Sequence, residues 1–82
     1  MRQRRLPLGN RNLIGQSVTK IRLELGLSQS GLLSRLELQG NSMDQSRLSN
    51  IEGQKTIVSD IELVAIARAL DVSVMDLLPQ QK

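Results

Sequence analysis

A row of hydrogen-bonding side chains between positions 45 and 52 is the stretch best suited to do chemistry. Leu48 and Ile51 have the spacing of one helical face, which predicts a short helix that buries both side chains. The side chains that would then face outward are Gln45, Ser46, Arg47, Ser49 and Asn50. Amide, hydroxyl and guanidinium groups can donate to and accept from base edges in the major groove of a duplex. We therefore interpret this row as a recognition surface.

A second short helix is predicted just before it, over about residues 29–36. The side chains on its apolar face are Leu32, Leu33 and Leu36. Ser28 stands at the N-cap position, which leaves Gln29 in the first turn. An amide beside free backbone N–H groups at a helix start is suited to hold a phosphate. Gln29 is therefore expected to contact a nucleic-acid backbone, with simple helix capping as the alternative.

The segment before these two helices predicts a longer supporting helix over about residues 12–25. Asn12 is the candidate N-cap, and Gly26 stands where a left-handed residue would end the helix. The expected buried stripe consists of Ile14, Val18, Ile21 and Leu25. Lys20 and Arg22 are expected to extend outward, where they could touch the backbone of a duplex or be merely solvated.

Two further helices are predicted after position 58. Ser59 and Glu62 have the spacing of a capping box, and the apolar helix that follows them is expected to be central and buried. Ser73 repeats the capping pattern for a short fifth helix, which Pro79 ends. These segments are interpreted as scaffold.

Three separated blocks then carry a family resemblance. They are Leu27-Ser28-Gln29, Leu48-Ser49-Asn50-Ile51-Glu52 and Ile66-Ala67-Arg68-Ala69-Leu70-Asp71-Val72-Ser73. In this order they resemble the helix-turn-helix domain of the phage repressor and Cro type, common in bacterial and phage regulators. The resemblance implies an all-α, compact, five-helix DNA-binding domain over residues 12–79. Residues 1–11 are then expected to form a flexible basic arm and residues 80–82 a C-terminal tail.

The resemblance also implies a set of DNA contacts. Base contacts are expected from Asp44, Gln45, Ser46 and Asn50. Backbone or flanking contacts are expected from Ser28, Gln29, Arg47, Ser49, Lys55 and Thr56, with Arg47 reaching phosphate or guanine. In the arm, Arg2, Arg4 and Arg5 could follow phosphates or enter a minor groove, or act only as a solubilising tail. Glutamine and asparagine suit adenine, whereas Asp44 could accept only from a cytosine amine.

The link between the two central helices departs from the family pattern. Residues 37–43 make it about five residues longer than the short turn of a standard helix-turn-helix. We expect the preceding helix to continue for another turn, with Leu38, until Gly40 stops it. Met43 is then expected to plug the core before Asp44 caps the recognition helix. A second departure is Gly53, because the family's glycine usually lies one residue later.

Composition limits the remaining possibilities. The 82 residues suit one domain, and the absence of Phe, Tyr, Trp, Cys and His leaves an aliphatic core without a disulfide or the usual metal ligands. The net charge is +3, with six basic and no acidic residues in positions 1–22 and an acidic balance after position 58. This asymmetry suggests contact with a polyanion near the N-terminal side. With no membrane-spanning run and no signal pattern, a soluble cytoplasmic protein is expected.

Together these patterns predict sequence-specific binding of double-stranded DNA by a small transcriptional regulator, expected to be a repressor. A homodimer on two half-sites is expected. The alternative is an antitoxin-like or adaptor module that kept the fold without specific DNA contact. An enzyme is disfavoured because no catalytic set is evident. No cofactor, metal or small-molecule ligand is predicted.

Overall fold

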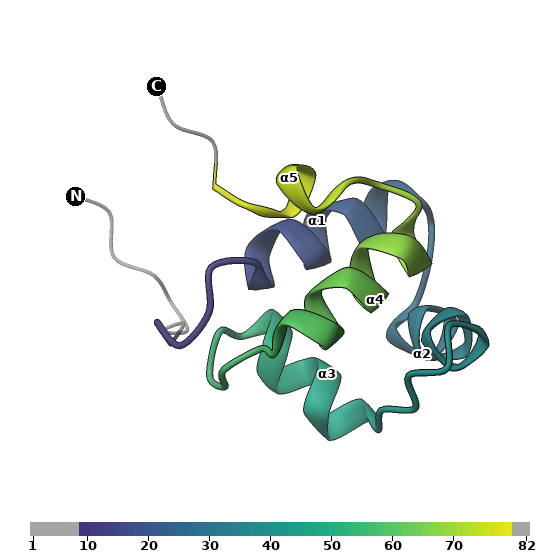
Figure 1. Ribbon diagram of the computed structural model, residues 1–82, viewed down its shortest axis with the longest axis horizontal. Helices are drawn as coiled ribbons and strands as arrows, with labels where there is room; N and C mark the ends of the chain where they lie inside the picture. The colour runs from purple at the N-terminus through teal and green to yellow at the C-terminus, as the bar shows by residue number, and fades with distance from the viewer. Residues whose placement is uncertain (1–8, 80–82) are drawn as a thin grey trace.

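The computed structural model describes residues 9–79, which form five helices and no strand. The helices are α1 (Gly15–Glu24), α2 (Gln29–Leu38), α3 (Gln45–Glu52), α4 (Asp60–Leu70) and α5 (Val74–Leu77). The helix α4 packs against α1, α2 and α5, whereas α3 packs against α1 and α2 at one side of the bundle (Figure 1). The predicted all-α, five-helix class is confirmed.

An aliphatic core holds the bundle together, as the lack of aromatic residues requires. The buried hydrophobic residues are Ile14, Val18, Leu32, Leu36, Leu48, Ile51, Ala65, Ile66, Ala67, Ala69, Leu70 and Leu77. Each of the larger side chains contributes about 1.5–3 kcal/mol when it leaves water. Leu48 and Ile51 are fully buried, so the predicted inward face of α3 is confirmed. The expectation for α4 holds only in part, because Ile61 and Val64 are exposed.

The start of α1 differs from the prediction. The helix begins at Gly15, and Ile14 occupies the N-cap position without a side-chain capping bond. Asn12 lies before the helix, where its Oδ1 accepts from the backbone N–H groups of Ile14 and Gly15 at 3.1 and 2.9 Å. Its Nδ2 donates to the carbonyl oxygens of Ile51 and Thr56 at 3.1 and 2.9 Å. One asparagine therefore ties the start of α1 to the end of α3.

The end of α1 agrees with the prediction for Gly26 but not with that for Leu25. Gly26 adopts the expected left-handed conformation with a φ of 72°. Leu25 was expected in the buried stripe, but it is exposed, whereas Ile21 is half-buried and packs against the core. Because Leu25 is the C-cap residue, it lies where the chain already turns away from the bundle.

The helix α2 has the predicted cap and the predicted extension. The Ser28 Oγ accepts from the backbone N–H of Gly31 at 3.0 Å. The helix continues to Leu38, and Gly40 then takes a left-handed φ of 81°. Leu38 is 86 % exposed, so the additional turn does not add to the core.

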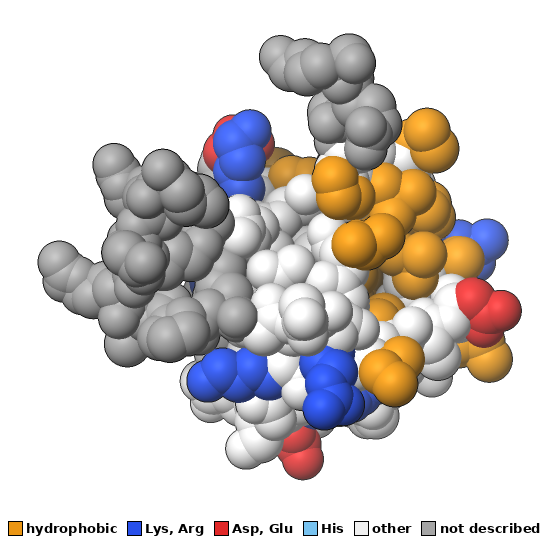
Figure 2. Space-filling view, turned by 90° about the vertical axis from the view of Figure 1, so that its left-hand side faces the viewer, with side chains coloured by type: hydrophobic (Ala, Val, Ile, Leu, Met, Phe, Trp, Pro, Cys, Tyr) orange, Lys and Arg blue, Asp and Glu red, His pale blue; other side chains and the backbone are white. Residues whose placement is uncertain are grey.

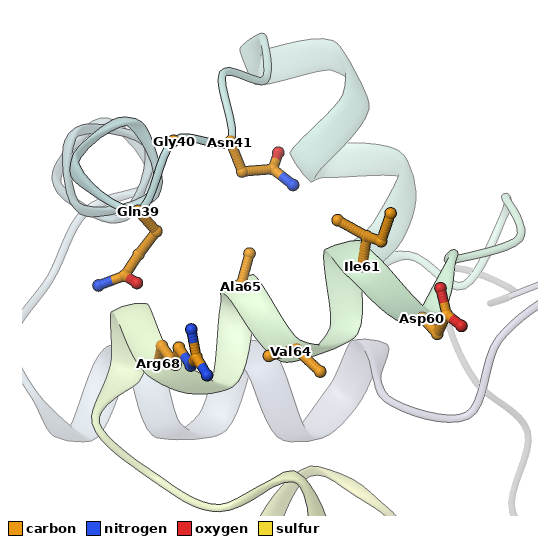
Figure 3. Close-up of a pocket in the computed structure, with 8 residues that line it drawn as sticks. All are labelled: Gln39, Gly40, Asn41, Asp60, Ile61, Val64, Ala65 and Arg68. Atoms are coloured by element: carbon orange, nitrogen blue, oxygen red, sulfur yellow. The ribbon is translucent and has the colours of Figure 1, made fainter.

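The extended link after α2 leaves a hollow against α4. Its volume is about 430 Å³. In Figure 3, Gln39 and Asn41 of the link face Ala65 of α4 across this hollow. Met43 is half-buried against the core, and the Asp44 Oδ1 accepts from the Arg47 backbone N–H at 2.8 Å. The link therefore ends in the predicted N-cap of α3.

Capping boxes start the last two helices, as predicted for α4. The Ser59 Oγ accepts from the Glu62 backbone N–H, and the Glu62 carboxylate accepts from the Ser59 N–H. Ser73 and Asp76 make the same reciprocal pair at α5. These caps satisfy backbone donors that a helix start would otherwise leave without partners.

Candidate nucleic-acid interface

The outward face of α3 carries the uncharged polar side chains that the sequence predicted. Those that are exposed on it are Gln45, Ser46, Ser49 and Asn50. The opposite face is anchored by two fully buried side chains and by packing against α1 and α2. A rigid helix with amide and hydroxyl groups on its free side can present hydrogen-bond donors and acceptors in a fixed pattern.

Gln29 connects the start of α2 to this face. Its Oε1 accepts from Gln45 Nε2 at 3.1 Å and from Ser49 Oγ at 3.2 Å. Its Nε2 donates to Glu52 Oε1 at 3.1 Å. The sequence predicts that Gln29 contacts a phosphate and that Gln45 contacts a base. In the structure, the two side chains are hydrogen-bonded to each other. This junction fixes the orientation of both amides.

A buried ion pair holds the other end of the same network. Arg22 of α1 donates from Nε to Glu52 Oε2 at 2.8 Å, and a second bond reaches Glu52 Oε1 at 3.1 Å. Its remaining terminal nitrogen donates to the Leu27 carbonyl oxygen at 2.9 Å. The prediction that Arg22 extends outward is wrong, because these partners satisfy the guanidinium inside the bundle. Its position four residues after the buried Val18 was the signal that could have found it.

Arg47 is the only Lys or Arg within α3, and its guanidinium bonds to the protein. It donates to the two carboxylate oxygens of Glu62 at 3.0 and 2.6 Å. It also donates to Thr56 Oγ1 at 2.8 Å and to the Ile57 carbonyl oxygen at 3.0 Å. The expected reach of Arg47 to phosphate or guanine is therefore not the conformation of this structure.

The bond to Arg47 also changes the ionisation of Glu62. It lowers the pKa of the Glu62 carboxyl, against the opposing effect of burial, and bonds from Ser59 add to the lowering. The same bond raises the pKa of Arg47. Both groups therefore stay charged near neutral pH, and their charges cancel beside α3.

The loop after α3 places a cation close to the recognition helix. Gly53 has an ordinary φ of −83°, whereas Gln54 is left-handed with a φ of 59°. The left-handed residue thus lies one position after Gly53, where the resembled family usually has its glycine. Lys55 follows with an exposed side chain, whereas Thr56 is half-buried against Arg47.

The beginning of the described chain runs along this loop. The Gly9 N–H donates to the Gly53 carbonyl oxygen at 2.9 Å, and the Arg11 N–H donates to the Gln54 carbonyl oxygen at 3.0 Å. These residues were expected to belong to the arm, yet they are bonded to the domain. The backbone of the exposed Arg11 is therefore held beside the loop that carries Lys55. Arg2, Arg4 and Arg5 lie outside the described residues.

Other surfaces of the molecule have different characters. Lys20 faces outward as expected, in an exposed ion pair with Glu24 at 3.5 Å. Hydrophobic side chains gather in one patch on the face drawn in Figure 2. One apolar hollow of the molecule is lined by Leu13, Ile14, Ile57, Val58, Leu63 and Leu78, together with Arg11 and Asn12.

Residues 9–79 contain neither a metal-binding cluster nor a helix that could span a membrane. That range holds no group of three or more Asp and Glu side chains placed to bind a metal ion. None of its helices has the length and apolar character needed to cross a membrane.

Comparison with known proteins gives one family and one structural relative. A family model described as helix-turn-helix matches residues 18–77. Among solved structures, the chain is similar to the restriction-modification controller protein C.AhdI from Aeromonas hydrophila. The TM-score is 0.70 with 28% sequence identity, over 79% of this chain and 91% of the other. A comparison with curated proteins found no match.

Proposed function

The chain belongs to the helix-turn-helix family, and from this premise we propose that it regulates transcription by binding a specific sequence of double-stranded DNA. The likeness to a protein described as a restriction-modification controller supports a regulatory role. We further propose that it acts as a repressor in the cytoplasm, and we assign it no catalytic activity.

The observation that carries the proposal is the fixed, uncharged polar face of α3. In the proposed complex α3 enters the major groove, and Gln45, Ser46 and Asn50 discriminate bases. The bonds from Gln45 and Ser49 to Gln29 hold the pattern in place before DNA arrives. Such preorganisation lowers the entropy cost of binding. Asp44 can contribute only where a cytosine amine lies within reach.

Phosphate contacts would set the position of α3 without reading sequence. The proposed contributors are the N-terminal end of α2 with Ser28 and Gln29, and the exposed cations Arg11 and Lys55. Gln29 uses one amide hydrogen on Glu52 and keeps the other for a phosphate. Arg47 is assigned a structural role, since its guanidinium is occupied by Glu62 and the loop.

We propose that two copies bind together on two half-sites. Large hydrophobic side chains are exposed on four of the helices. They are Leu23 on α1, Leu38 on α2, Ile61 and Val64 on α4, and Met75 on α5. Pairing of two apolar surfaces of this kind would remove them from water, and helix-turn-helix dimers in general bind half-sites one helical turn, or a multiple of it, apart.

Selection of bound duplexes from a random pool, at physiological salt, tests the proposal. We expect an enriched sequence with two related half-sites, and an affinity that falls steeply as salt rises because counterions are released. A pool without enrichment, and no salt-dependent binding to any duplex, would reject the proposal and favour a protein-interaction module. An enriched single half-site would reject the paired arrangement alone.

A further inference from the structure

Two arginines beside the outward, base-reading face of α3 (Gln45, Ser46, Ser49 and Asn50) are already paired with carboxylates. Arg22 is bonded to Glu52, and Arg47 is bonded to Glu62. The first pair is buried, but the second is only partly covered, with side-chain exposures of 34% for Arg47 and 18% for Glu62. Arg47 is therefore close to solvent, and its restraint depends on the carboxylate that holds it.

The position of Arg47 makes this restraint important. Arg47 lies three residues before Asn50, so the two side chains are neighbours along the surface of α3. A mobile guanidinium at this edge of the reading face would lie within reach of the phosphates that border a groove. Phosphate contacts add affinity for every sequence alike, so they do not help to distinguish bases.

The carboxylate of Glu62 is itself held in place by α4. Its Oε1 accepts from the Ser59 N–H at 3.0 Å and from the Ser59 Oγ at 3.3 Å. Glu62 thus belongs to the first turn of a helix that packs in the centre of the bundle. It offers the guanidinium a preformed site with two acceptor oxygens, supplemented by Thr56 Oγ1 and the Ile57 carbonyl.

We propose that Glu62 is a positioning residue for DNA specificity, which acts by holding the Arg47 guanidinium on the protein and away from phosphates. The inference rests on the proposed function. Affinity then depends mainly on hydrogen bonds from the amides and hydroxyls of α3 to bases. Attraction between Arg47 and the phosphates, which is the same for every sequence, stays weak. Glu62 touches no base in this arrangement, and it changes specificity only through Arg47.

The substitution Glu62→Gln tests this role. The glutamine oxygen can still accept from Ser59, so the cap of α4 is kept while the charge that restrains Arg47 is removed. We expect the plot of log affinity against log salt for a random-sequence duplex to steepen by about 0.9, the value of one added phosphate contact. The affinity ratio between the selected and the random duplex should fall.

Two further variants separate this role from a general effect of charge or folding. Glu24→Gln makes the same change at an exposed ion pair on α1 and should keep the salt slope and specificity ratio of the wild type. The double variant R47Q/E62Q keeps the net charge and has no guanidinium to release. It should also keep the wild-type salt slope, and circular dichroism checks that each variant is helical.

Several results would overturn the inference. An unchanged slope and ratio for Glu62→Gln would show that the carboxylate does not restrain a phosphate-seeking group. A slope for R47Q/E62Q shallower than wild type by about 0.9 would show that Arg47 already contacts phosphate. This second comparison can overturn the inference even if Glu62→Gln alone does not fold. Failure of the wild type to bind any duplex would instead reject the proposed function.

Discussion

Asn50 and Lys55 are both exposed near the end of the recognition helix, but they are expected to act on different parts of a duplex. Asn50→Ala should relax the base preference at one position by about 1–3 kcal/mol, because an amide can bond to two groups on one base edge. Competition between duplexes that differ at single positions measures this effect. A uniform loss over all duplexes would contradict the assignment of Asn50 to a base.

Lys55→Ala serves as the matched control. It should weaken binding to all duplexes alike and reduce the salt slope by about one, as expected for a phosphate contact. If Lys55→Ala changed the preferred sequence, its assignment to the backbone would be wrong.

Sequence reasoning found the exposed residues of the site more readily than the paired ones. The outward direction of Gln45, Ser46, Ser49 and Asn50 follows from helical spacing alone. The partners of Arg22 and Arg47 lie 30 and 15 residues away in the sequence. Nothing in the local pattern of either arginine identifies its carboxylate partner, although the position of Arg22 four residues after Val18 indicates that it lies on the buried side of α1.

At the scale of elements, substitution of glycine by alanine is expected to change the stability of the fold in opposite directions at two helical positions. Gly15 starts α1 against the end of α3, where an added Cβ would meet the carbonyl oxygens of Ile51 and Glu52, the latter at 2.7 Å. Gly15→Ala should therefore destabilise the fold by about 1–3 kcal/mol, because backbone atoms must move. Urea unfolding followed by circular dichroism measures the change.

Gly31→Ala in α2 is the comparison. The added Cβ would lie 3.3 Å from a terminal methyl carbon of Leu27, a half-buried side chain that can shift. Alanine favours a helix by up to about 1 kcal/mol over glycine, so this variant should be more stable than the wild type. A loss of stability for Gly31→Ala equal to that for Gly15→Ala would contradict the prediction of opposite effects.

The boundaries of α2 to α5 were predictable where a signal lay within a few residues. Ser28, Asp44, Ser59 and Ser73 each cap the helix that follows, as their positions suggested. The start of α1 was not predictable in this way. Asn12 divides its hydrogen bonds between the first N–H groups of α1 and two carbonyl oxygens about 40 residues later. A tertiary contact thus decides where that helix begins.

At the scale of the whole molecule, the Arg47–Glu62 pair predicts how stability depends on pH. The pKa of Glu62 is below its ordinary value of 4.5 in the folded protein. The pair therefore stabilises the fold above that value, and this contribution is lost as pH falls from 4.5 through the lower folded pKa. Thermal unfolding from pH 7 to pH 3 should show a smaller acid-induced loss for Glu62→Gln than for the wild type.

Parallel pH profiles for the two proteins would exclude this coupling. R47Q/E62Q provides the control, because it lacks both charges and should follow the flatter profile. The partial exposure of the pair means that solvent weakens its contribution. The comparison therefore depends on the difference between the profiles and not on the total acid sensitivity of the domain.

Gln45 and Ser49 donate to Gln29, and Gln29 in turn donates to Glu52. The direction of these hydrogen bonds determines which donors and acceptors on α3 are left for a duplex. Ser49 has given its only hydroxyl hydrogen to Gln29, so in this arrangement its oxygen can accept a further hydrogen bond but cannot donate one. Gln45 has spent one amide hydrogen but retains its carbonyl oxygen and a second N–H, the opposite groups that N6 and N7 of adenine require. In the proposed complex, the polarity of these bonds would therefore suit Gln45 to adenine, and it would leave the flanking Ser49 only an acceptor for DNA.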